Sequence, residues 1–461
     1  MPGPALRCCV APEGRILFQR RHPVAAPCGH RSGRNNRGGH KQERQTISNH
    51  RFRRKGCCAR RTAVYGEAMP GIIIKPRARI FHGHEWVYGA EVLKMFGSPE
   101  PGDVITLKDF KDRSLGTGIF NPKSQIIARR FSRHREDLTH DFFVRRLRRA
   151  LAWRETVPGL DVRLCRLVWS ESDGLPGVII DRYGDHFVLQ TLTLAMDMRK
   201  ELIVSALVEI FSPASIVERN DSPSRLAEGM ETVTGVLHGQ TPEPFRLTTQ
   251  DGLTFLIDPV GGQKTGIYLD QLDNYQQAAR HAKGRRVLDC FCNQGGFALA
   301  AALAGAEHVT AVDASDSAIE TARANAEAMG VADRIEFVTG NVFDYLKAQE
   351  AAGAHWDVII LDPPSFARSR KTVADALRGY KEIHLRALKL LTSGGILSTY
   401  CCSHHVSTGE FQEVILEAAV DAKRTLRRLE IHSQRADHPV LPGIPESEYL
   451  RGYTYELMPA F

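Results

Sequence analysis

The chain contains 461 residues, of which 43% are hydrophobic and 25% are charged, together with 39 Gly and 23 Pro. This composition is typical of a globular chain of two or three domains, and it excludes fibrous and wholly disordered proteins. The longest apolar runs, such as Val358 to Leu361, are long enough only for buried strands, so we expect no membrane-spanning helix.

The net charge of +8 is carried by the first part of the chain. Residues 1–68 hold 15 Lys and Arg against 3 Asp and Glu, whereas residues 69–461 hold 46 against 50. Because residues 1–68 also lack periodicity and have few apolar side chains, we expect a basic, disordered extension. It would either contact RNA phosphates as an arm or, in the interpretation that we favour, lie outside a natural protein that begins at Met69.

The ten cysteines divide evenly between these two parts: Cys8, Cys9, Cys28, Cys57 and Cys58, then Cys165, Cys290, Cys292, Cys401 and Cys402. They form no regular CxxC pair and no apolar signal core lies near the start, which favours a reducing cytoplasm. A zinc site at Cys28, His30, Cys57 and Cys58 has suitable residue types, but the spacing matches no familiar site. We therefore expect no metal.

A small, mostly-β module is expected from Ile72 to about Arg130, where short apolar runs alternate with turn signals. Arginines follow it directly and recur on a helix expected over Asp141 to Arg154. They form either an ordinary solvated face or a local basic patch for nucleic acid. Because the charge of residues 69–461 is nearly balanced, nucleic-acid binding there would need such a local patch. These arginines are Arg129, Arg130, Arg133, Arg135, Arg145, Arg146, Arg148 and Arg149.

The next stretch, to about Val236, predicts a compact α+β unit whose chemistry is not readable. Its expected elements are two strands, a helix and a further strand: Val178 to Asp181, Phe187 to Thr191, Met198 to Ile210 and Ser215 to Glu218.

Strands separated by helical stretches then indicate βαβ units and a doubly wound parallel sheet, which binds ligands at the carboxyl ends of its strands. The expected strands are Arg286 to Phe291, His308 to Asp313, Ile335 to Val338, Val358 to Asp362 and Ile396 to Cys402. The helix after the second strand is expected to begin at a capping box of Ser317 and Glu320 and to end at Gly330.

The first of these strands runs into the turn Gly295-Gly296 at a helix start, where backbone can approach a ligand closely. Asp313 ends the next strand, at a separation typical of a carboxylate that binds ribose hydroxyls. The GxGxxG and GxxxxGK[ST] motifs are both missing, so a cofactor without a pyrophosphate, S-adenosylmethionine, fits better. We interpret Cys290 and Cys292 as packing residues.

Two further strand ends carry reactive groups. One ends in Asp362-Pro363-Pro364, where the prolines stiffen the exit, and the other in Cys401-Cys402. Neighbouring ends of a parallel sheet would bring a thiol and a carboxylate into one cleft.

From Ile72 to about Glu456 the chain resembles bacterial 23S ribosomal RNA (cytosine-C5)-methyltransferases of the PUA-containing, RlmI-like type. The resemblance rests on His84-Glu85-Trp86-Val87-Tyr88, Glu171 to Gly177, Lys264 to Gln271, the Asp289 to Phe297 loop, Asp362-Pro363-Pro364, Cys402-Ser403 and Asp437-His438-Pro439. It implies a PUA RNA-binding domain over residues 70–140, a central α+β domain over 141–236 and a Rossmann-like, class I methyltransferase domain over 237–461. The implied cofactor is S-adenosylmethionine, the implied partner is ribosomal RNA, and a homodimer is one option for the assembly.

The resemblance also implies roles for single residues. Asp289 and Gly295 belong to the cofactor loop, Asp313 to the ribose contact and Asn341 to the adenine contact, where the family commonly has Asp. Asp362 would hold the target base and Cys402 would be the nucleophile. The base that takes the C5 proton is not identified; His404 and His405 depart from the small or apolar residues expected there.

Two alternatives remain. Methylation of an exocyclic base nitrogen needs no thiol, but Ser365 stands where that chemistry would have an aromatic residue. A noncatalytic RNA-binding assembly factor would need neither the intact cofactor loop nor Cys402.

Overall fold

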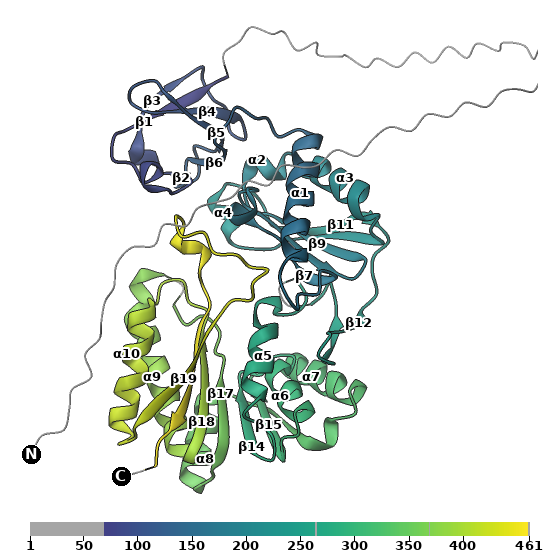
Figure 1. Cartoon of the computed structure of the whole chain (residues 1–461), viewed down its shortest axis with the longest axis vertical. Helices are drawn as coiled ribbons and strands as arrows, with labels where there is room; N and C mark the ends of the chain where they lie inside the picture. Colours follow the sequence, from purple (N-terminus) through teal and green to yellow (C-terminus); the bar gives the residue numbers. More distant parts are fainter. Residues whose placement is uncertain (1–68, 263–264, 368, 460–461) are drawn as a thin grey trace, which may run out of the picture. The chain divides into compact units, whose positions relative to one another are not determined.

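The computed structural model describes residues 69–262, 265–367 and 369–459 (Figure 1). The extension over residues 1–68, its candidate zinc ligands and Lys264 lie outside the described residues.

The mostly-β module predicted from Ile72 is confirmed as a six-stranded sheet of order β2-β6-β5-β4-β1-β3. Only β1 and β4 pair in parallel; the other pairs are antiparallel. Ile72, Ile105 and Phe120 are buried in its core. The strands are β1 (Gly71–Ile74), β2 (Trp86–Val87), β3 (Val92–Phe96), β4 (Val104–Lys108), β5 (Ser114–Phe120) and β6 (Ala128–Ser132).

A second sheet, of order β11-β10-β9-β8-β7, follows the helix α1 (His140–Glu155). Thr139 caps α1 by accepting a hydrogen bond from the backbone N of Phe142, and Phe142, Phe143 and Leu147 bury its apolar face. The elements are β7 (Leu164–Trp169), β8 (Val178–Tyr183), β9 (His186–Thr191), α2 (Leu194–Asp197), α3 (Lys200–Phe211), β10 (Ser215–Asn220), α4 (Ser224–Ala227) and β11 (Val233–Gly239).

The doubly wound sheet has seven strands in the order β16-β15-β14-β17-β18-β20-β19. The first five strands pair in parallel, and β20 pairs antiparallel with both β18 and β19. The strands are β14 (Arg286–Cys290), β15 (His308–Asp313), β16 (Ile335–Thr339), β17 (Trp356–Leu361), β18 (Leu391–Cys401), β19 (Leu426–Ser433) and β20 (Arg451–Leu457), preceded by the hairpin β12 (Phe245–Thr248) and β13 (Thr254–Ile257).

Helices cover both faces of this sheet (Figure 1). Side chains from α5 (Leu272–Ala279), α6 (Gly296–Leu303) and α7 (Asp316–Ala328) form one hydrophobic core with the sheet. Those from α8 (Val342–Ala352), α9 (Val373–Leu390) and α10 (Thr408–Asp421) form the other. Successive residues of a strand point to opposite faces, so each strand contributes to both cores.

The capping box predicted at Ser317 and Glu320 is wrong. The helix α7 begins two residues earlier, and Ser315 is its N-cap, whose hydroxyl accepts a hydrogen bond from the backbone N of Ala318. Serine is a favourable N-cap residue at either position. Because β15 ends at Asp313, the chain can begin the helix directly afterwards, and Ser315 rather than Ser317 becomes the N-cap.

None of the helices in the described part of the chain is long and apolar enough to cross a membrane.

Candidate active site

The site lies at the carboxyl ends of β14, β15, β17 and β18. β14 is hydrogen-bonded to β15 on one side and to β17 on the other, so the chain order reverses there. In such sheets the crevice above this reversal is the usual ligand site. Asp313 is the last residue of β15 and Asp362 follows β17 directly, so both carboxylates lie at this edge.

The loop after β14 has an unusual backbone. Phe291, Asn293 and Gly295 all have positive φ angles, of 64°, 47° and 86°. Gly296 begins α6, and a Cβ atom there would lie 2.3 Å from the ring of Tyr275. The glycine pair is therefore required for both the left-handed turn and the close packing of α6 on α5. This turn exposes backbone where a ligand approaches a helix start.

Asp289 is fully buried beneath this loop. Its Oδ2 accepts a hydrogen bond of 3.0 Å from the backbone N of Ala298, while Oδ1 has no hydrogen-bond partner among the described residues. Burial raises the pKa of Asp289 to about 8, and the negative charges of Asp362 and Asp313 add to the shift. The unsatisfied oxygen of Asp289 is open to a polar contact with a ligand, and the neighbouring carboxylates of Asp313 and Asp362 suit a cationic ligand such as a sulfonium.

Asp313 and Asn341 both bind nearby backbone. Asp313 accepts from the backbone N of Asn293 and of Ser315, both at 2.9 Å, and so fixes the glycine-turn loop. Asn341 is exposed and is the N-cap of α8, because its Oδ1 accepts from the backbone N of Phe343 at 2.9 Å. The ribose and adenine contacts remain predictions, and an adenine amino group would share the oxygen that caps α8.

Cys402 and Asp362 lie in adjacent loops. β17 and β18 pair in parallel with Leu361 opposite Thr399, and the Sγ of Cys402 lies 3.7 Å from the carbonyl oxygen of Pro363. The structure thus brings the thiol and the Asp362-Pro363 segment together, as the order of the strands predicted.

The two adjacent cysteines face opposite sides of the sheet. Cys401 ends β18 and is fully buried in the core formed with α8, α9 and α10, where burial raises its thiol pKa. Cys402 is half-buried and packs against the other core. Only one of the two can therefore reach the cleft.

Several site residues received no role from the sequence. Gln271 donates from Nε2 to Oδ2 of Asp362 at 3.0 Å. Ser365 and Ser403 are joined by a 2.9 Å hydrogen bond between their hydroxyls, which ties the two loops together. The only indication of Gln271 in the sequence was its place in the motif Lys264 to Gln271. Exposed His404 has its ring 5.5 Å from that of Tyr449.

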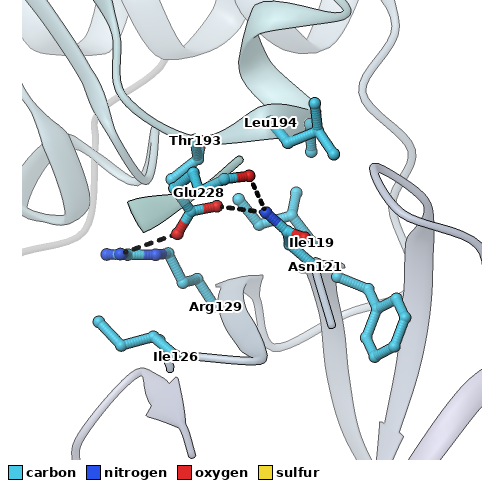
Figure 2. A pocket seen from close by; sticks show the side chains of 9 residues that line it. Ile119, Asn121, Ile126, Arg129, Thr193, Leu194 and Glu228 are labelled. Carbon is cyan, nitrogen blue, oxygen red and sulfur yellow. Dashed lines mark hydrogen bonds and ion pairs between the residues drawn. The ribbon is translucent and has the colours of Figure 1, made fainter. Parts of the chain in front are cut away.

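The arginines after the β module are largely paired with carboxylates. Arg129 contacts Glu171 at 2.8 Å and Glu228 at 3.6 Å, and Figure 2 shows Glu228 between Arg129 and Asn121. Arg130 is buried against Glu85, and exposed Arg133 contacts the same carboxylate. Arg129 and Arg130 therefore join parts of the fold and add little to a basic patch.

Comparisons with known proteins agree with this architecture. The family model of a PUA-like domain matches residues 72–133, and that of an S-adenosylmethionine-dependent methyltransferase matches residues 231–444. With the doubly wound sheet and its glycine turn, these matches define an S-adenosylmethionine-dependent methyltransferase that carries a PUA-like domain.

The ribosomal RNA large subunit methyltransferase I of Photobacterium profundum is 40% identical over 374 residues, which cover 80% of this chain and 94% of that protein. The protein of the same name from Klebsiella pneumoniae is 39% identical over 393 residues, which cover 84% and 98%. The chain belongs to the ribosomal RNA large subunit methyltransferase I family, and this confirms the resemblance inferred from its motifs.

Solved structures show the same fold. One, described as an S-adenosylmethionine-dependent methyltransferase from Streptococcus mutans, has a TM-score of 0.71 and 22% identity and covers 84% of this chain and 99% of that one. Another, described as a methyltransferase complexed with S-adenosylhomocysteine, has a TM-score of 0.73 and 23% identity with the same coverage.

Proposed function

We propose that the protein methylates C5 of a cytosine in 23S ribosomal RNA, in the cytoplasm, through a covalent bond between Cys402 and C6 of the base. The observation that carries the proposal is the placement of Cys402 beside the Asp362-Pro363 segment, at the edge of the sheet that also holds Asp289 and Asp313. The relatives named as ribosomal RNA large subunit methyltransferases support the choice of substrate.

The residues at the glycine turn fit S-adenosylmethionine, because Asp289 offers an unsatisfied buried oxygen and Gly295 a left-handed turn. When bound, this cofactor supplies an electrophilic methyl group on a sulfonium. Asp289 and Gly295 would hold it at the loop, Asp313 at its ribose and Asn341 at its adenine. The carboxylates of Asp313 and Asp362 favour its positive charge.

C5 of cytosine is a poor nucleophile, and this explains the need for a thiol. The Cys402 thiolate adds to C6, which makes C5 electron-rich enough to take the methyl group. Asp362 stabilises the ring at N3 and N4 during this addition. A base then removes the C5 proton, and the electrons of that bond re-form the C5–C6 double bond as the thiolate leaves.

The target cytosine must be unstacked, since neither C5 nor C6 can be reached inside a helix. An unpaired loop or a flipped base therefore suits this site. Neither methylation of a ring amino group nor a noncatalytic role would need a thiol beside Asp362.

Mass mapping of 23S ribosomal RNA from cells that lack the gene tests the proposal. One cytosine should lose 14 Da, about the mass of one CH₂ unit, and a plasmid copy of the gene should restore it, whereas a Cys402→Ala copy should not. Unchanged RNA, or loss of a methyl group from another base or from an exocyclic nitrogen, would contradict it.

A further inference from the structure

Two buried carboxamide side chains form a line of hydrogen bonds that ends on Asp362. Gln271 ends the short helix η4 (Leu269–Gln271), and its Nε2 donates to Oδ2 of Asp362 at 3.0 Å. Asn274, in α5, donates from Nδ2 to Oε1 of Gln271 at 2.7 Å and to the carbonyl oxygen of Ser433 at 3.1 Å. Gln271 is 3% exposed and Asn274 is 1% exposed. The hydrogen bonds thus run from the end of β19 to Asp362.

The donor and acceptor groups of these side chains fix the direction of the hydrogen bonds between them. An ionised carboxylate only accepts hydrogen bonds, so Gln271 must turn its amide nitrogen toward Asp362. Its oxygen then faces Asn274, which must present its own nitrogen. A flipped amide at either position would place like groups together in a buried site, where an unmade hydrogen bond is costly.

The side chain that donates a hydrogen bond to Asp362 has to be uncharged. Asp362 lies close enough to Asp289 for its charge to raise the pKa of that carboxyl, so negative charge on both groups at once is unfavourable. A lysine or arginine would relieve the repulsion but would also cancel the negative charge that attracts a sulfonium. A carboxamide orients Asp362 and adds no charge.

We propose that Gln271 and Asn274 are positioning residues that hold the carboxylate of Asp362 in the orientation used on the target base. The proposal rests on the function proposed above. Pro363 and Pro364 stiffen the backbone after Asp362, while Gln271 fixes its side chain and Asn274 holds Gln271 in place. Fixing a reacting group in place raises the rate of the chemical step and leaves cofactor affinity unchanged.

The test compares Gln271→Met and Gln271→Glu in the full-length protein, with 23S ribosomal RNA from cells lacking the gene as substrate. Gln412→Glu is the matched control, because Gln412 is a half-buried carboxamide on α10 that bonds to Tyr453. Gln271→Met should lower kcat about ten- to a hundredfold, the effect expected for losing a hydrogen bond to a charged group. S-adenosylmethionine affinity, measured by calorimetry, should change less than about twofold by the same argument.

Gln271→Glu should move the acid limb of the pH–rate profile upward, because two facing carboxyls retain a proton to higher pH. Gln412→Glu should leave the profile in place. Asn274→Ala should lower kcat less than Gln271→Met does, since the direct bond to Asp362 remains.

A wild-type kcat and pH profile in the Gln271 variants would overturn the proposal, as would a loss confined to thermal stability. If Gln271→Met does not fold, the isosteric Gln271→Glu still decides through its pH profile. Failure of the wild-type protein to methylate cytosine C5 would instead contradict the proposed function, so the two failures are distinct.

Discussion

The adjacent thiols at the end of β18 differ in surroundings. Cys401 is enclosed by the core formed with α9 and α10, whereas Cys402 lies 3.7 Å from the carbonyl oxygen of Pro363. Cys402→Ala should abolish methyl transfer and leave S-adenosylmethionine binding intact, because the thiol acts only on the base. Cys401→Ala should retain transfer and lower stability slightly. Activity lost in Cys401→Ala and kept in Cys402→Ala would reverse the assignment.

Asp313 should contribute to cofactor affinity in two ways. It is the expected ribose acceptor, and it holds the loop through the backbone N of Asn293. Charge-assisted hydrogen bonds contribute about 1.5–3 kcal/mol, so Asp313→Ala should weaken S-adenosylmethionine binding roughly ten- to a hundredfold. Calorimetry measures this directly. An unchanged affinity in a folded variant would remove Asp313 from the site.

Asp289 should make stability depend on pH. Its pKa is raised from 3.8 to about 8 in the fold, chiefly by burial. Between these two pH values the folded state keeps a proton that the unfolded state loses. The contribution of Asp289 to the free energy of unfolding is therefore complete below pH 4 and falls as the pH rises to about 8. The slope is at most about 1.4 kcal/mol per pH unit.

Asp289→Asn, which stays neutral, isolates this contribution. Without cofactor, its free energy of unfolding relative to wild type should rise between pH 5 and about pH 8 and level off above it, as measured by urea unfolding. A constant difference over this range would show that Asp289 is ionised in the fold.

The site residues differed in how readily the sequence revealed them. Carboxylates at the ends of strands, such as Asp313 and Asp362, could be placed because parallel strands share an edge. Gln271 could not, since its contact with Asp362 joins segments 91 residues apart and depends on how η4 packs. The Ser365–Ser403 contact was missed for the same reason.

At the scale of elements, periodicity located the parallel strands well, and β15 has the predicted bounds, His308–Asp313. β11 and β19 were missed because they lie at sheet edges, where many of their side chains are exposed and apolar patterning is weak. β7 was missed because β-propensity depends on pairing partners that a single segment does not show.

The cap of α7 gives a test at this scale. Ser315 accepts from the backbone N of Ala318, whereas the exposed Ser317 hydroxyl bonds to the Ser315 hydroxyl and, among the described residues, to no backbone N–H. Ser315→Ala should lower the free energy of unfolding by about 1 kcal/mol, and Ser317→Ala should change it by a few tenths, about the effect of an ordinary surface substitution. Urea denaturation of both variants measures the difference. Equal losses would contradict the assignment of Ser315 as the cap.

At the scale of the whole molecule, the composition did not predict which surface of the protein binds RNA. The predicted cluster of arginines exists in the sequence, but Arg129 and Arg130 bind Glu171, Glu228 and Glu85 within the fold. Ion pairs between distant segments are set by tertiary packing, so charge counts along the sequence cannot reveal them. The motifs spread from His84 to Pro439 were more informative, because together they indicated the family to which the curated relatives belong.

The most direct test of the central claim uses 23S ribosomal RNA transcribed with 5-fluorocytosine in place of cytosine. Fluorine at C5 cannot leave as a proton does, so the reaction should stop with the base bound to the enzyme. We expect a stable complex that survives denaturation, requires S-adenosylmethionine and maps to Cys402 by peptide mass analysis. No complex, or a complex at Cys401, would contradict the account.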